Sequence, residues 1–330
     1  MGPTLPTHGQ LSMSERRNTF PLSNSSRQKP RKWPLAFRFI KGAIHHAIII
    51  PVSIHTLFTL LIVSLDAHSA YNLGIPASIV PSLSIVVGLM LVFRNSSSYD
   101  RYWGGRTGLQ SIVNSVRNLT RSFLVCGPLD DDQDRAETEK VVKTLVAIMY
   151  AVKNHLRGNW GAMEFQPEYR MLVPEGLDGH EGEGVGMALE LGFVVERYIK
   201  RGARKGAFNA PQSAMLNGQL NGIMDAYGQM ETIKLTPIPV CQQIHQKQVL
   251  ALYCCILPFC LVDEMGWWTV PVLSLICFTL YGIEGIGEEL EDPFGYDKND
   301  IKIDAIIEDA RQEVLVLLEG WKKGSDEYYQ

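Results

Sequence analysis

The sequence lacks the short motifs that mark the common enzyme classes. It has no Walker-type phosphate loop, no GxSxG nucleophile motif and no HExxH zinc motif. Its six cysteines show no CxxC spacing and mostly lie in apolar surroundings, which is typical of small buried residues and not of zinc ligands or a disulfide framework. A basic domain with interleaved aromatic residues is also missing, so nothing supports binding to nucleic acid.

Charged residues are absent or scarce in four stretches of the chain. The mean hydropathy is near zero although 20% of the residues are charged, so the apolar residues must be concentrated in blocks. Blocks long enough, or nearly so, for a hydrocarbon layer of about 30 Å occur at about 43–65, 75–93, 240–262 and 267–286. The third begins with a polar half, which either enters the membrane late or lies in a protein-lined water space. We therefore predict an all-α membrane protein with four transmembrane helices.

Lysine and arginine are missing from two short connections, 66–76 and 263–266. Basic residues favour the cytoplasmic side, so these loops are expected outside and both chain ends inside. Trp267 and Trp268 mark the outer interface. The remaining polar sequence, 94–239 and 287–323, is predicted to form a helical cytosolic region, with helices over about 137–156, 187–200, 211–233 and 302–323 and a long loop over 158–186.

The N-terminal segment 1–32 is basic, rich in serine and proline, and carries Glu15 as its only acid. Such a composition cannot bury enough apolar surface to order itself, so we expect a disordered basic tail. A targeting peptide is the alternative, since transit peptides are also basic and serine-bearing. The membrane-associated part of the chain is expected to begin at about residue 33.

The second apolar block continues into a polar, arginine-bearing run, Leu83–Arg106, with no proline and no glycine between Gly88 and Gly104. This pattern predicts one long helix, half in lipid and half in water. Ile85, Leu89 and Phe93 recur every fourth residue and share one face. Two interpretations are open. The stripe packs in the core and the arginines that follow it are an ordinary positive-inside flank, or the stripe is the gate of an anion pore and the arginines line its inner mouth.

A pore formed by one long helix per chain requires a ring of identical chains, because four spans cannot easily enclose one. Cyclic symmetry would turn the three apolar residues into three stacked rings. Asp100 lies seven residues after Phe93 and therefore near the same face. An acid beneath an anion gate would repel the permeant ion, so Asp100 should be paired or rotated away.

The acidic segment Glu284–Asp300 has two further interpretations. Asp297 and Asp300 are oxygen ligands at loop spacing that would suit Ca²⁺, although the segment is not an EF-hand, and the alternative is a solvated turn that caps the last helix. Glu284, Glu288 and Glu291 share a helical face and, with the histidines of the first span, could form a carboxylate–histidine metal site. The paired ExxH motifs of such bundles are missing.

Three motifs carry a resemblance to a known family: FRNSSSYDRYWGGR at 93–106, TPIP at 236–239 and EELEDPFGYDKND at 288–300. Over about Pro34–Trp321 the sequence resembles the bestrophin family of anion channels, in particular its bacterial, fungal and plant branch. The resemblance implies a homopentamer with the pore on its central axis. It implies a pore neck at Ile85, Leu89 and Phe93, a cytosolic aperture at Phe208 before Pro211, and a pore-mouth motif comprising Arg94, Asn95, Asp100 and Arg101.

The animal members bind calcium through the segment that holds Asp297 and Asp300 here. Tyr296, Lys298 and Asn299 thin the acidic run in this chain, so we expect no required cofactor. The predicted function is a channel for chloride and other small monovalent anions, not an enzyme, in a multi-pass protein of the plasma membrane. An organellar membrane, a cation-selective member of the family and a metal-dependent membrane enzyme are the alternatives.

Overall fold

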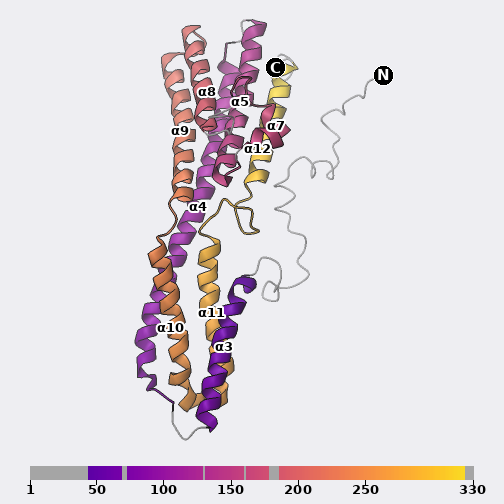
Figure 1. Ribbon diagram of the computed structural model, residues 1–330. Coiled ribbons are helices and arrows are strands. Elements are labelled where there is room, and N and C mark those ends of the chain that lie inside the picture. The colour runs from indigo at the N-terminus through magenta and orange to yellow at the C-terminus, as the bar shows by residue number, and fades with distance from the viewer. Residues whose placement is uncertain (1–43, 69–72, 129–130, 160, 178–185, 324–330) are drawn as a thin grey trace, which may run out of the picture. The chain divides into compact units, whose positions relative to one another are not determined.

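The computed structural model describes residues 44–68, 73–128, 131–159, 161–177 and 186–323 (Figure 1). All regular structure within these ranges is helical, which confirms the predicted all-α class. The chain divides into two compact units. Among the described residues, unit 1 holds Gly104–Lys234 and 301–323, and unit 2 holds 44–103 and Leu235–Asp300.

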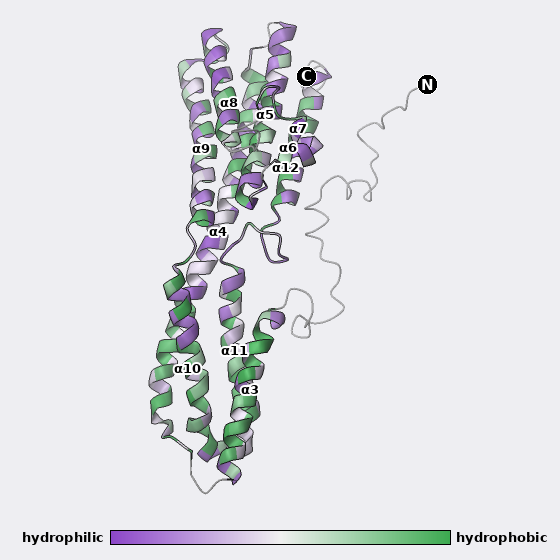
Figure 2. Cartoon of the chain, in the orientation of Figure 1, coloured by the Kyte–Doolittle hydropathy of each residue, from purple (hydrophilic) through white to green (hydrophobic). Residues whose placement is uncertain are grey.

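Unit 2 is built from apolar helices. It contains α3 (His45–His68), α10 (Val240–Met265) and α11 (Thr269–Glu289), with the short 3-10 turn η3 (Gly266–Trp268) between the last two. The three helices pack against one another. Figure 2 shows that hydrophobic residues cover most of their surface. Apolar residues all around a helix are expected where its outer face meets lipid.

Three helical stretches are long and apolar enough to cross a membrane: His45–His68, Ala77–Cys126 and Val240–Glu289. The third stretch comprises α10, η3 and α11. The predicted spans at about 43–65, 240–262 and 267–286 therefore coincide with α3, α10 and α11, each to within a few residues.

The helix α4 (Val80–Cys126) is continuous over 47 residues, preceded by the 3-10 turn η2 (Ala77–Ile79). This confirms the single long helix predicted from Leu83–Arg106. Its residues up to Trp103 belong to unit 2 and the rest to unit 1. In unit 2, the buried side of α4 presents Val87 and Leu91 to a core cluster from α10 and α11, which comprises Leu250, Cys254, Leu257, Leu273 and Cys277.

Unit 1 is a helical bundle around α5 (Asp132–Arg157), which is buried along almost all of its length after Val141. It packs against α8 (Met187–Arg204) and α12 (Ile303–Lys322). The unit also contains α9 (Ala210–Leu235), which approaches α4 closely because α4 has glycine at the contact. A Cβ atom at Gly108 would lie 2.8 Å from Met230 Cγ.

The structure differs from one predicted segment and does not describe another. The prediction of one long loop over 158–186 is wrong in part. The short helices α6 (Ala162–Phe165) and α7 (Pro167–Arg170) form within this range. Proline 167 opens α7 at its first position, where the missing N–H costs no hydrogen bond. The predicted tail 1–32 lies outside the described residues.

Candidate functional site at the inner end of unit 2

The three sequence motifs, far apart in the chain, meet at one place in unit 2. Arg94 from α4 is 3% exposed, and its Nη2 donates to Glu291 Oε2 at 3.3 Å. The other carboxylate oxygen of Glu291 accepts from the backbone N–H of Ile238 at 3.2 Å and from Gln243 Nε2 at 2.8 Å. Glu291 therefore joins the first motif to the second and is itself part of the third.

Arg101 strengthens the same junction through backbone carbonyls. Its Nε donates to the carbonyl of Glu291 at 2.9 Å and its Nη1 to the carbonyl of Thr236 at 2.6 Å. Asn95 Nδ2 donates to the carbonyl of Ile283 at 3.0 Å, near the end of α11. A guanidinium that holds two carbonyls from different segments fixes both of them, since its fork of donors is rigid.

A second acidic group lies beside Arg94. Glu284 is 6% exposed, and its Oε1 lies 3.9 Å from Arg94 Nε and 3.7 Å from Lys247 Nζ. Lys247 also pairs with Glu288 at 3.0 Å. Gly287 lies against the same arginine: a Cβ atom there would be 3.4 Å from Arg94 Cγ, an ordinary van der Waals contact. The polar first half of the third span is thus used for contacts with acids at the end of α11.

This charge cluster is not fully hydrogen-bonded. Within the described part of the chain, Arg94 Nε, Arg94 Nη1 and Glu284 Oε1 have no hydrogen-bond partner. A buried ion pair with unused donors is costly to desolvate and is seldom retained for stability alone. We therefore regard the cluster as a functional junction.

The expected neck residues lie on the opposite side of α4 from the core. Ile85, Leu89 and Phe93 are 71%, 53% and 63% exposed. Core packing within one chain, the first of the two interpretations, therefore does not account for the stripe. An exposed apolar stripe on a membrane helix faces lipid, another protein chain or an enclosed pore.

Asp100 continues this exposed face. Its side chain is exposed, and it makes no ion pair or hydrogen bond with the residues that the structure describes. Of the two outcomes expected for Asp100, pairing or rotation away, pairing is not found among the described residues. Nearby on the same helix, the exposed rings of Tyr99 and Trp103 stack at 6.4 Å between centroids.

Phe208, the expected aperture residue, lies in the core of unit 1 and is 2% exposed. Its ring packs against Phe123 and Tyr198 at 6.2 and 6.1 Å between centroids. It also fills the space next to Gly202, where a Cβ atom would lie 2.4 Å from the ring. In a single chain this side chain has a packing role and not the exposed position that an aperture requires.

The expected calcium ligands form a tight turn. Asp300 is 6% exposed, and its Oδ2 accepts a hydrogen bond from the backbone N–H of Asp297 at 2.7 Å. Burial raises the pKa of the Asp300 carboxyl; the Asp297 N–H opposes this, while the charges of Asp297, Asp292 and Glu289 add to it. Calcium takes six to eight oxygen ligands. The described residues contain no group of three or more His, Cys, Asp or Glu side chains suited to a metal.

One histidine of α3, His55, packs against another helix. His55 is 5% exposed, and its Nε2 lies 2.9 Å from the Tyr281 hydroxyl of α11. Of the three acids considered for a metal site with the histidines, Glu284 and Glu291 lie beside Arg94 and Glu288 pairs with Lys247.

Sequence analysis missed the central role of Glu291, and it did not connect Gln243 and Lys247 with the acids after the fourth span. A usable signal was present. Polar residues at the start of an apolar helix need partners, and the only nearby acids that the topology offers lie at the end of α11. Which acid meets which donor follows from helix packing and not from the sequence pattern.

The fold and site define a helical membrane protein in which a buried charged junction ties α4 and α10 to the segment after α11. The family model for bacterial and fungal bestrophin proteins matches residues 24–316. The chain belongs to this bestrophin family.

Curated relatives and solved structures agree with this. The chain is 37% identical over 292 residues to a voltage-dependent anion channel-forming protein of Nostoc sp., covering 87% of this chain and 91% of the relative. It is 34% identical over 303 residues to a protein of the same name from Synechocystis sp., covering 91% and 97%. A bacterial bestrophin homolog from Klebsiella pneumoniae has the same fold, with a TM-score of 0.70, 22% identity and coverage of 82% and 98%.

Proposed function

We propose that the protein is an anion channel. The support is its family membership together with the names of the relatives from Nostoc and Synechocystis, both called voltage-dependent anion channel-forming proteins. Chloride and other small monovalent anions are the proposed permeant ions. Weakly hydrated anions such as iodide or nitrate should pass at least as well as chloride, because an apolar neck favours ions that dehydrate easily.

The single observation that carries the proposed mechanism is the exposed stripe of Ile85, Leu89 and Phe93 on α4. We propose that five chains assemble around an axis, with four membrane spans each, and that the stripe forms the neck of a central pore. In such a ring each residue would provide one apolar ring, and a narrow apolar constriction gates by dewetting. The junction at Arg94 and Glu291 would hold α4 in place directly after the stripe.

A triple substitution tests the neck. Ile85→Ala, Leu89→Ala and Phe93→Ala together should raise the open probability, because a wider and less apolar constriction stays wetted. The matched control is Ile50→Ala, Ile54→Ala and Leu57→Ala, three exposed apolar residues on α3. Unchanged single-channel records from the triple variant would place the gate elsewhere.

Calcium binding at Asp297 and Asp300 stays a prediction, and so does an aperture at Phe208. Calorimetry with CaCl₂ tests the calcium site: binding to the wild-type protein that Asp300→Asn abolishes would support it.

Phe208→Ala tests the aperture. Altered conductance in a folded protein would support an aperture, whereas loss of folding would support the packing role that its burial indicates.

A further inference from the structure

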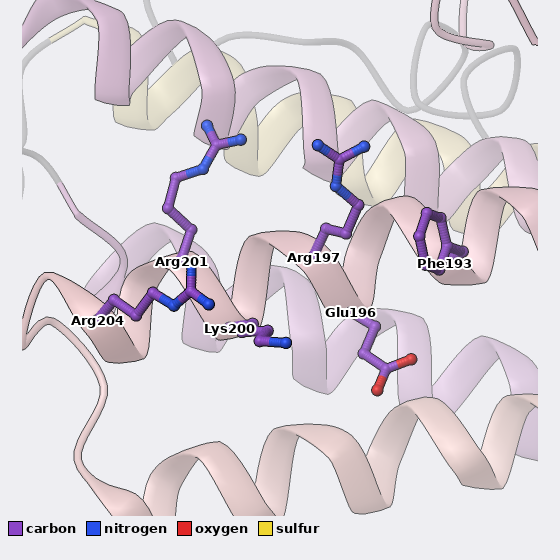
Figure 3. Close-up of a pocket in the computed structure, with 6 residues that line it drawn as sticks. All are labelled: Phe193, Glu196, Arg197, Lys200, Arg201 and Arg204. Atoms are coloured by element: carbon purple, nitrogen blue, oxygen red, sulfur yellow. The ribbon is translucent and has the colours of Figure 1, made fainter.

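A row of basic side chains on α8 lines a pocket in unit 1 of about 410 Å³ (Figure 3). The pocket is formed by one exposed aromatic ring, one acid and four cations, namely Phe193, Glu196, Arg197, Lys200, Arg201 and Arg204. The cations stand at helical positions i, i+3, i+4 and i+7 and so occupy one side of the helix. From Arg197 to Arg204 they extend over about 10 Å of helix, at 1.5 Å per residue.

Nearby acids neutralise only part of this charge. Arg201 pairs with Glu137, and Lys205, just past the helix, pairs with Asp134. Lys200 and Arg204 make no ion pair within the described part of the chain. Elsewhere in unit 1, several basic side chains do have acidic partners, as in Arg117–Glu313, Arg157–Asp304 and Arg311–Glu308.

Helix electrostatics explain only some of these residues. Arg201 and Arg204 lie in the last turn of α8, where a cation interacts favourably with the helix dipole. Arg197 and Lys200 lie before that turn, and like charges at i, i+3 and i, i+4 repel one another. Arg197 gains a second contact from the Phe193 ring, 5.8 Å from its guanidinium carbon. Glu196, four residues before Lys200, offsets part of the repulsion. A bound anion with several charges would relieve what remains.

We propose that this α8 pocket binds a multiply phosphorylated anion, distinct from the small anions of the proposed pore. Guanidinium groups bind phosphate oxygens in pairs, and a row of them matches a chain of phosphates better than a single monovalent ion. The phosphate groups could belong to a soluble polyphosphate compound or to a lipid headgroup. The pocket lies within unit 1, so the proposal does not depend on the conduction path.

The test uses the full-length protein in nanodiscs of neutral phosphatidylcholine, titrated with sodium tripolyphosphate by calorimetry. We expect saturable binding that weakens at least tenfold in the variant Lys200→Gln with Arg204→Gln, and that weakens with added salt because the groups are exposed. The control variant is Arg135→Gln with Lys323→Gln, which removes the same charge from exposed positions of unit 1 outside the pocket. It should bind as the wild type does.

A second arm distinguishes the source of the phosphate. Native mass spectrometry of protein from nanodiscs containing a polyphosphoinositide, whose headgroup carries several phosphates, would show retained lipid, and loss of that lipid in the pocket variant alone would identify a headgroup as the ligand. Tripolyphosphate binding in neutral nanodiscs would instead identify a soluble ligand. The proposal is overturned if neither probe binds, or if both variants bind as the wild type does.

Discussion

At the scale of single residues, Glu291 holds the most connected position in unit 2. Its side chain accepts hydrogen bonds from Arg94, Gln243 and the Ile238 backbone, and its carbonyl accepts one from Arg101. Arg94 is buried, so without Glu291 its charge would have only the more distant carboxylate of Glu284. Removing one member of a buried pair leaves an uncompensated charge, which costs far more than losing a pair at the surface.

Glu291→Gln should therefore destabilise the protein strongly, by about 3 kcal/mol. The matched control is Glu288→Gln, one turn earlier, whose side chain is 56% exposed and pairs with Lys247. That pair lies at the surface, so its loss should cost about 0–1 kcal/mol. Thermal unfolding in detergent measures both. Equal shifts in melting temperature for the two variants would contradict the role assigned to Glu291.

Asp300 provides a prediction on pH. Its pKa is raised in the folded protein by burial and by neighbouring acids, so the folded state holds this proton more tightly than the unfolded state does. Stability should then increase as the pH falls through the raised pKa towards the ordinary value. Asp300→Asn should remove this part of the pH dependence and should not destabilise the protein at neutral pH. Melting temperatures between pH 7 and pH 4 test this, and identical pH profiles for both proteins would refute it.

At the scale of helices, α4 has one side buried in unit 2 and one exposed apolar side. Val87, Leu91 and Arg94 face the interior of unit 2, whereas Ile85, Leu89 and Phe93 are exposed. The exposed face continues to Asp100, an acid without a partner within the described part of the chain. If the stripe faces a pore, Asp100 stands at its inner mouth and opposes the entry of anions.

Asp100→Asn should therefore raise the single-channel anion conductance, most clearly at low ionic strength, where screening is weakest. Asp132→Asn, an exposed acid at the start of α5, is the control and should leave conductance unchanged. Conductance that is the same in wild type and Asp100→Asn at every salt concentration would remove Asp100 from the conduction path.

The end of α8 offers a packing test of the burial of Phe208. Gly202→Ala would place a methyl group 2.4 Å from the Phe208 ring, so the ring must move, at a cost of about 1–3 kcal/mol. Gly218→Ala in α9 meets nothing within 4 Å and should stabilise its helix by about 0.5–1 kcal/mol. Hydrogen exchange across α8 and α9 measures both. An unaffected Gly202→Ala protein would mean that Phe208 is not held in this position.

At the scale of the whole molecule, the long helices could be predicted from the sequence, but the contacts between them could not. Hydrophobic blocks and the unbroken run of Leu83–Arg106 predicted α3, α4, α10 and α11, because length and periodicity depend on local sequence alone. The burial of Phe208 and the partners of Glu291 could not be predicted, since they depend on how helices distant in sequence pack. Short helices α6 and α7 were missed because the glycines on either side of them, together with Pro167 and Pro174, are typical of a loop.

A metal-dependent membrane enzyme, the alternative to a channel, would retain its metal through purification. The names of the relatives point to a channel. Elemental analysis of the purified protein should accordingly find no stoichiometric iron. One iron per chain, retained through purification, would revive the carboxylate–histidine site considered from the sequence.

The central claim is that identical chains form an anion-selective pore. A planar bilayer that contains the purified protein, with a gradient of potassium chloride across it, tests this most directly. We expect a current whose reversal potential lies near the chloride equilibrium potential. The triple neck variant should pass this current more readily than the wild type. A reversal potential near that of potassium would show a cation-selective pore, and a folded, membrane-inserted protein that passes no current would contradict the channel itself.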